Sequence, residues 1–176
     1  MGQSPLQSLH AALAVIPAPV VLELGTCRSR PHVATHHQAW VPDARRYWMT
    51  DIAAGPDVDF VTDAHQMGLA DNTCDVVISC STYEHLEKPW VATDELFRIV
   101  RAGGVAFVQT HQSFPLHAYP NDYWRFTTSA LTSLFSRWDI LACDYEFPAS
   151  IVPMTIPDTC GQSPAWLNVS ITARKP

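Results

Sequence analysis

The sequence lacks the motifs and long runs that mark several large classes of protein. It has no G-x-x-x-x-G-K-[ST] motif, which excludes ATP binding through a P-loop, and no G-x-G-x-x-G motif for a dinucleotide pyrophosphate. It also has no long block of Lys or Arg, and its formal net charge is −6, so nucleic acid is not an expected partner. The apolar stretch near its start is interrupted by Pro17 and Pro19 and is too short to cross a membrane.

The cysteines of the sequence show no spacing typical of a disulfide framework or a metal site. The five cysteines are odd in number and form no C-x-x-C motif, which favours buried or loop thiols in a reducing cytoplasm. They are Cys27, Cys74, Cys80, Cys143 and Cys160. A length of 176 residues with 47% hydrophobic residues suits one folded domain, which we expect to span residues 1–176. We therefore expect a single-domain cytoplasmic protein.

Short apolar runs alternate with turn signals and helical stretches along the chain. Strands are predicted at 20–25, 47–52, 58–62, 75–79, 105–110, 138–145 and 166–173, and helices at 88–101 and 127–135. This alternation predicts an open, mostly parallel α/β sheet whose last two strands can pair antiparallel at one edge. Between those two strands, the Pro-rich segment 148–164 is predicted to be a long loop, either a functional lid or merely a surface loop.

Acidic residues stand at the carboxyl ends of successive predicted strands, where ligands of open α/β sheets bind. Glu23 precedes Gly25 at the first strand, Asp51 ends the second, and Asp63 follows the third. An acid after the second strand can accept both hydroxyls of a ribose, and an acid after the third can accept an adenine amino group. A cofactor without phosphates fits this turn, and S-adenosylmethionine would place its ammonium at Glu23 and its carboxylate at Arg28 or backbone amides.

Six motifs together carry a family resemblance. VLELGT, YWMTDI, GPDVDFVTDAHQM, CDVVISCSTYEHLEKPW, ELFRIVRAGGVAFVQT and YPNDYWRFT follow one another over about residues 20–135. In these motifs the chain resembles the class I S-adenosylmethionine-dependent methyltransferases, in the group related to small-molecule methylases. The resemblance implies a Rossmann-like open twisted sheet of seven mostly parallel strands, with an antiparallel last strand and helices on both faces.

The same resemblance implies where the cofactor contacts lie. Glu23 and Gly25 would meet its methionine moiety, Asp51 its ribose hydroxyls, and Asp63 with the backbone of Ala64 its adenine. The floor after the fourth strand would be lined by residues 79–81. The predicted cofactor-binding residues are Glu23, Gly25, Thr26, Arg28, Asp51, Ile52, Asp63, Ala64, Ser79 and Ser81.

The opening turn departs from the family pattern of an acid followed by three alternate glycines. Cys27 and Ser29 stand where the second and third glycines belong, and a Cβ narrows the turn and disfavours positive φ. Pro31 indicates that the helix after this turn is short or displaced, and His36 and His37 on that segment are expected to be exposed or to cap a turn. A degenerate relative that acts as a binding or partner protein therefore stays open beside the enzyme.

Histidines after two neighbouring strands are the candidates for chemistry. His85 follows the fourth strand, and His111 and His117 follow the fifth, so all three can face one pocket. Methyl transfer to oxygen or nitrogen often needs a base, and an imidazole with a pKa of about 6.5 suits that task. We predict these three as catalytic residues. Together with Glu84 they could form a divalent-metal site, but their spacing is loose and no metal ligand is assigned.

The sequence thus predicts methyl transfer to a small molecule, at oxygen, with histidine-assisted deprotonation. The acceptor pocket would be built from 27–45, 111–126 and 148–164, or from a second subunit, which makes a homodimer possible. Arg125, in the aromatic stretch YPNDYWRF, would pair with an acid such as Asp122 or bind an anionic group of the acceptor. A divalent-metal-dependent methyltransferase is the other alternative.

Overall fold

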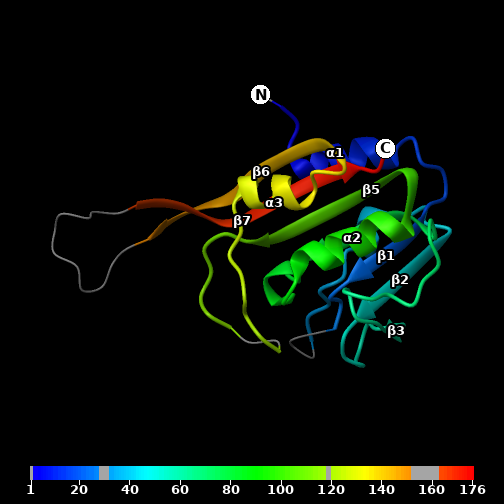
Figure 1. Cartoon of the computed structure of the whole chain (residues 1–176), viewed down its shortest axis with the longest axis horizontal. Coiled ribbons are helices and arrows are strands. Elements are labelled where there is room, and N and C mark those ends of the chain that lie inside the picture. Colours follow the sequence, from blue (N-terminus) through cyan, green and yellow to red (C-terminus); the bar gives the residue numbers. More distant parts are fainter. Residues whose placement is uncertain (1, 28–31, 118–119, 152–162) are drawn as a thin grey trace.

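A mixed sheet organises the chain, whose computed structural model describes residues 2–27, 32–117, 120–151 and 163–176. Within these residues, seven strands lie in the order β3-β2-β1-β4-β5-β7-β6 (Figure 1). The strands are β1 (Val20–Leu24), β2 (Arg46–Asp51), β3 (Phe60–Val61), β4 (Cys74–Cys80), β5 (Val100–His111), β6 (Asp139–Ile151) and β7 (Ser163–Arg174). The helices are α1 (Pro5–Leu13), α2 (Pro89–Ile99) and α3 (Thr128–Leu134), with 3₁₀ turns η1 (Gln38–Trp40) and η2 (Tyr83–His85).

The strand directions confirm the predicted fold class. Neighbouring strands from β3 through β5 all pair in parallel, and β7 is antiparallel to both β5 and β6. The chain order reverses between β1 and β4, because β1 continues to β2 on one side while β4 continues to β5 on the other. In open α/β sheets such a reversal opens a crevice beyond the carboxyl ends of the two strands. The sheet therefore provides a ligand site at the ends of β1 and β4.

Both faces of the sheet are covered by helices, as predicted. Successive side chains of a strand point to opposite faces. Leu22 packs in a buried cluster with Leu96 of α2, whereas Val21 packs in a separate cluster with Leu9 of α1. All five residues of β1 are buried. This double burial explains why the central strands are continuous apolar runs rather than alternating ones.

The connection between β1 and β2 contains little helix. In its described part, residues 32–45, only the three residues of η1 are helical. The predicted shortening of the helix after the first turn is confirmed for these residues. Trp40 anchors the segment by packing edge-on against Phe107 of β5, with ring centroids 5.6 Å apart. A loop therefore covers the sheet beside the opening turn.

The hairpin of β6 and β7 corrects the prediction of a loop at 148–164. Strand pairing continues through Pro148 opposite Trp166 and as far as Ile151 opposite Ser163, and the hairpin projects from the sheet (Figure 1). Pro148 is tolerated because β6 is the edge strand. The pairing of β7 with β5 begins at Asn168, so the part of β7 before Asn168 has no β5 partner. The rest of the predicted loop, 152–162, lies outside the described residues.

Smaller differences concern element ends. The predicted strand at 58–62 is reduced to the two residues of β3, and the predicted helix at 88–101 ends at Ile99 because β5 begins at Val100. In the part of the chain that the structure describes, none of the helices has the length and hydropathy needed to cross a bilayer.

Candidate functional site

A cavity of about 580 Å³ lies beyond the carboxyl ends of β1, β2 and β4. Six of the predicted cofactor residues line it: Gly25, Asp51, Ile52, Asp63, Ala64 and Ser81. Two of the three predicted catalytic histidines, His85 and His117, line it as well. The cavity therefore brings together most of the residues that the sequence selected.

Four predicted residues lie off the cavity wall, and one cannot be placed. Glu23, Thr26, Ser79 and His111 are all buried, at 2%, 1%, 0% and 6% exposure, and none belongs to the lining. Arg28 lies outside the described residues. Of the three segments predicted to build the pocket, 27–45 and 111–126 contribute lining residues such as Thr35 and His117, whereas the described part of 148–164 contributes none.

The opening turn is shaped by Gly25 and held to β2. Gly25 has a φ of +77°, which glycine adopts without strain. Its amide donates to the carbonyl of Thr50 at 2.8 Å, and the hydroxyl of Thr26 donates to the carbonyl of Asp57 at 2.6 Å. The next amide, of Cys27, donates to Asp51 Oδ2 at 3.0 Å. The turn thus keeps its amides on β2 and its open side on the cavity.

Asp51 is the best-placed carboxylate of the cavity. It is 8% exposed, and its two oxygens accept separate backbone amides, Oδ2 from Cys27 and Oδ1 from Ala53 at 3.1 Å. Each carboxylate oxygen has a second lone pair, so Asp51 can accept two further hydrogen bonds. This is the acceptor pattern that a pair of vicinal hydroxyls requires.

Glu23 is enclosed by partners from the following segment and from β2. The amide of His37 donates to its Oε2 at 2.9 Å, the ring Nδ1 of His37 lies 2.7 Å from Oε1, and the hydroxyl of Tyr47 donates to Oε2 at 2.5 Å. Burial and the neighbouring Glu23 charge raise the pKa of Tyr47, which therefore stays protonated as a donor. His37 stands at the N-cap position of η1 but makes no side-chain capping hydrogen bond there, and both His36 and His37 are partly buried rather than exposed. Glu23 thus ties residues 37–47 to β1.

Asp63 is paired with a histidine that sequence reasoning missed. Its Oδ1 accepts the amide of His65 at 2.8 Å and lies 2.7 Å from Nδ1 of the same residue. Nε2 of His65 accepts the amide of Lys88 at 3.2 Å, which fixes the proton on Nδ1. Burial opposes the Asp63 charge, but the hydrogen bonds from His65 outweigh it and lower the pKa of the carboxyl. The D-x-H spacing was the available signal for this pair.

Glu84 and His111 form a buried ion pair beneath the cavity. Glu84 is fully buried, its Oε2 accepts the Thr110 hydroxyl at 2.7 Å, and its Oε1 lies 2.9 Å from Nε2 of His111. Burial lowers the pKa of His111, but Glu84 outweighs it and raises that pKa; burial likewise opposes the Glu84 charge, and His111 and Thr110 lower the carboxyl's pKa. Nδ1 of His111 lies 3.1 Å from Oδ1 of Asn168. Both ring nitrogens of His111 therefore face oxygen acceptors.

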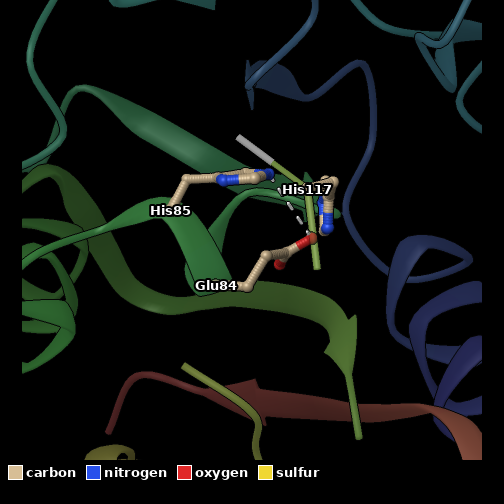
Figure 2. Close-up of side chains that lie close together, drawn as sticks. All are labelled: Glu84, His85 and His117. Carbon is tan, nitrogen blue, oxygen red and sulfur yellow. Dashed lines mark ion pairs between the residues drawn. The ribbon is translucent and has the colours of Figure 1, made fainter. Parts of the chain in front are cut away.

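His85 and His117 have one ring nitrogen engaged and line the cavity. Nδ1 of His85 donates to the carbonyl of Asn121 at 2.5 Å. Nδ1 of His117 lies 3.1 Å from the carbonyl of Pro115 and 3.4 Å from Oδ2 of Asp122. These acceptors favour the Nδ1–H tautomer, which leaves Nε2 with its lone pair. Figure 2 shows the two rings on either side of the Glu84 carboxylate.

Arg125 pairs with Asp122, which is one of the two alternatives that the sequence predicted for it. Its guanidinium binds both carboxylate oxygens of Asp122, and it also donates to the carbonyls of Phe114 and Pro115. The hydrogen bond from Arg125 lowers the pKa of Asp122, against the opposing effect of burial. Arg125 therefore stabilises the loop that carries His117.

Comparison with known proteins gives one family match and many matches of fold. Residues 24–108 match the family model described as a methyltransferase domain. No curated protein matches the sequence. A candidate methyltransferase of Bacillus halodurans is 15% identical with a TM-score of 0.63, and the match covers 95% of this chain and 98% of that one.

Two further structures extend the comparison. A candidate methyltransferase in complex with the Haloferax volcanii methyltransferase activator Trm112 is 15% identical, with a TM-score of 0.63, over 96% of this chain and 88% of that one. The 1,6-didemethyltoxoflavin-N1-methyltransferase of Burkholderia thailandensis, with 1,6-didemethyltoxoflavin and S-adenosylhomocysteine bound, is 16% identical, with a TM-score of 0.62, over 96% and 78%. These matches support S-adenosylmethionine as the cofactor. The chain has the fold of the class I S-adenosylmethionine-dependent methyltransferases, and its residues 24–108 match the methyltransferase-domain model.

Proposed function

We propose that the protein transfers a methyl group from S-adenosylmethionine to an oxygen of a small molecule. One observation carries the proposal: Gly25, Asp51 and Asp63 line the same cavity as His85 and His117. Bound S-adenosylmethionine supplies a methyl group on a sulfonium. The cavity volume of about 580 Å³ suits small ligands.

The acidic residues that line the cavity fit an adenosine. Asp51 has acceptor capacity for two ribose hydroxyls beyond the amides it already binds. His65 occupies Oδ1 of Asp63, so Oδ2 is the oxygen that would accept an adenine amino group. Gly25 lines the cavity without a Cβ, which would overlap Oγ1 of Thr82. Contacts of Glu23 and Arg28 with the methionine moiety stay predictions, because the Glu23 oxygens are held by His37 and Tyr47.

The histidines that line the cavity would activate the acceptor. We favour His85 and His117 over His111, because both nitrogens of His111 already face oxygen atoms. A neutral Nε2 would take the hydroxyl proton of the acceptor while the new C–O bond forms and the C–S bond of the sulfonium breaks. The Burkholderia enzyme is a precedent for a small-molecule acceptor in this fold.

A partner protein without catalysis is the second candidate. The observation that favours it is the enclosure of Glu23, whose carboxylate is taken up within the chain. The Haloferax structure, a complex of a candidate methyltransferase with an activator protein, is a precedent for protein partners in this fold. Cofactor titration separates the two candidates, since only the enzyme requires S-adenosylmethionine.

The test is calorimetric titration with S-adenosylmethionine and S-adenosylhomocysteine. We expect micromolar binding for the native protein and, for Asp51→Ala, at least about a tenfold loss, because hydrogen bonds to a charged group contribute about 1.5–3 kcal/mol each. Asp94→Ala is the matched control, since Asp94 is an exposed carboxylate on α2 that pairs with Arg137. Unchanged affinity in Asp51→Ala removes the ribose assignment. No binding of either ligand at millimolar concentration favours the partner protein.

The remaining predictions concern surroundings and assembly. We propose that residues 1–176 act as one domain in the cytoplasm, which the free thiols of Cys74, Cys80 and Cys143 support. The net charge of −6 supports a small-molecule rather than a nucleic-acid acceptor. A homodimer stays a prediction.

A further inference from the structure

Three side chains of types that can bind a metal ion converge beside the cavity. Glu84 and His85 belong to η2 after β4, and His117 follows β5, the parallel neighbour of β4. One potential ligand atom of each residue lies within 4.8 Å of those of the other two (Figure 2). The adjacency of the two strand ends therefore assembles two nitrogen donors and one oxygen donor.

The two histidines are held as metal-bound histidines usually are. Such residues donate the proton of one ring nitrogen to a carbonyl or carboxylate, which orients the ring and leaves the other nitrogen for the metal. His85 makes this contact with the carbonyl of Asn121, at 2.5 Å. His117 makes it with the carbonyl of Pro115 and lies 3.4 Å from the carboxylate of Asp122. Both tautomers therefore present Nε2 as the ligand atom.

The carboxylate is also oriented from behind. Thr110 donates to Oε2 of Glu84, and His111 lies 2.9 Å from Oε1. Oε1 lies 3.8 Å from Nε2 of His85, and a carboxylate oxygen can accept a hydrogen bond and bind a cation with separate lone pairs. Glu84 is fully buried, so bulk water does not compete for its hydrogen bonds with Thr110 and His111. These contacts explain why the carboxylate is stable here although no Arg or Lys of the described residues pairs with it.

The geometry selects the class of cation. Metal–nitrogen and metal–oxygen bonds of about 2.0–2.2 Å place neighbouring ligand atoms about 3–3.5 Å apart, so the present cluster would contract by about 1 Å or more. Two imidazoles and one carboxylate suit Zn²⁺, Mn²⁺ or Fe²⁺, whereas Mg²⁺ and Ca²⁺ prefer oxygen ligands. His85 and His117 line the cavity, so a cation would keep coordination positions open toward it.

We propose that Glu84, His85 and His117 bind one divalent transition-metal cation whose open positions receive an oxygen of the acceptor. The role at the acceptor rests on the proposed function. A cation there would lower the pKa of the bound hydroxyl, and the proton would leave to water. The histidines would then serve as ligands, since an Nε2 lone pair bound to metal cannot take a proton. An acceptor with a hydroxyl able to coordinate a metal follows as the substrate class.

Direct metal titration of the full chain tests the site without any methyl donor. Protein stripped with EDTA is titrated with Zn²⁺, Mn²⁺ and Mg²⁺ by calorimetry. We expect one equivalent of Zn²⁺ or Mn²⁺, weaker Mg²⁺ binding, and at least a tenfold loss of affinity in His85→Asn and His117→Asn. His10→Asn is the control, because His10 is an exposed histidine on α1. Since Glu84 is buried, His117→Asn is the decisive variant; its side chain is 32% exposed, so its loss leaves the core intact.

The outcomes separate this proposal from the proposed function. Absence of stoichiometric binding, or equal affinity in His117→Asn, His85→Asn and the native protein, overturns the metal site. If S-adenosylhomocysteine still binds in that case, the methyltransferase proposal stands and the histidines return to the role of base. If the metal binds and S-adenosylhomocysteine does not, the metal site stands and the proposed function fails.

Discussion

Replacing Gly25 by alanine tests whether the opening turn depends on the one glycine it keeps. Gly25 has a φ of +77°, and an added Cβ would overlap Oγ1 of Thr82 and lie 3.1 Å from its Cβ and Cγ2. Thr82 cannot move away freely, because its hydroxyl donates to the carbonyls of Leu24 and Cys80 at 3.2 Å each. The perturbation therefore combines backbone strain with steric overlap at the wall of the cavity.

The chain offers a control that separates these two effects. Gly103 has a φ of +78°, but nothing lies within 4 Å of the Cβ position. Gly103→Ala should therefore cost only the backbone strain, about 1–2 kcal/mol of the free energy of unfolding. Gly25→Ala should cost that amount and about 1–3 kcal/mol more for the overlap with Thr82. The expected difference between the two variants is thus about 1–3 kcal/mol.

Urea unfolding and calorimetry measure the two consequences. Gly25→Ala should unfold at a lower urea concentration than Gly103→Ala, and it should bind S-adenosylhomocysteine at least about tenfold more weakly, which is about 1.4 kcal/mol. Gly103→Ala should bind the ligand as the native protein does. Equal unfolding free energies for the two variants would refute the steric argument, and equal affinities would refute the placement of the cofactor against Gly25.

Two further predictions concern the supports of the cavity. Thr110→Val removes the hydroxyl that donates to the buried Glu84 at 2.7 Å, so the free energy of unfolding should fall by about 1.5–3 kcal/mol, and a loss below about 0.5 kcal/mol in urea titrations would contradict that support. The Asp122 carboxyl has a lowered pKa in the folded state, so it contributes stability above its unfolded pKa of about 3.9 and loses it as the pH falls toward the folded value. The difference in unfolding free energy between native protein and Arg125→Gln should therefore shrink from pH 6 to pH 3, and a constant difference would exclude the pair as its source.

The positions of Asp51 and Asp63 were predictable because they depend on topology alone. Parallel neighbouring strands end at one edge of a sheet, so acids at successive strand ends reach one cavity whatever the details of packing. Asp51 and Asp63 both line the cavity. Their precise partners were less accessible to sequence reasoning, and His65 was missed although it stands two residues after Asp63. The spacing of Asp63 and His65 indicated their contact, but the pattern of apolar residues gave no indication of it.

The enclosure of Glu23 could not be read from the sequence. Its partners come from residues 14 and 24 positions away, and the contact with His37 depends on how a loop without a regular helix crosses the sheet. The prediction of a loop at 148–164 was wrong for another reason. Prolines at 148, 153, 157 and 164 indicated a loop, but Pro148 lies on an edge strand, where proline is tolerated.

His111 and His117 show how six residues of sequence separate two environments. β5 ends at His111, opposite Asn168 of β7, so the His111 ring is held beneath the cavity with Asn168 and Glu84 as partners. His117 stands beyond the strand end, on the loop that Arg125 stabilises, and reaches the cavity wall. The sequence predicted both as catalytic, and it could not show that only His117 of the two lines the cavity, because it did not show where β5 ends.

The altered glycine motif has a geometric explanation that favours a working cofactor site. Among the described residues of the turn, 25–27, only Gly25 has positive φ, so Thr26 and Cys27 adopt backbone conformations open to any residue. The Cys27 amide binds Asp51, a contact that does not depend on the side chain at that position. A cysteine in place of the second glycine therefore changes the surface of the cavity without closing the turn. If this reasoning holds, Cys27→Gly will leave the affinity for S-adenosylhomocysteine within about threefold, or about 0.65 kcal/mol, of the native value. A gain of a hundredfold in the same calorimetric assay would instead mark Cys27 as the residue that impairs the site.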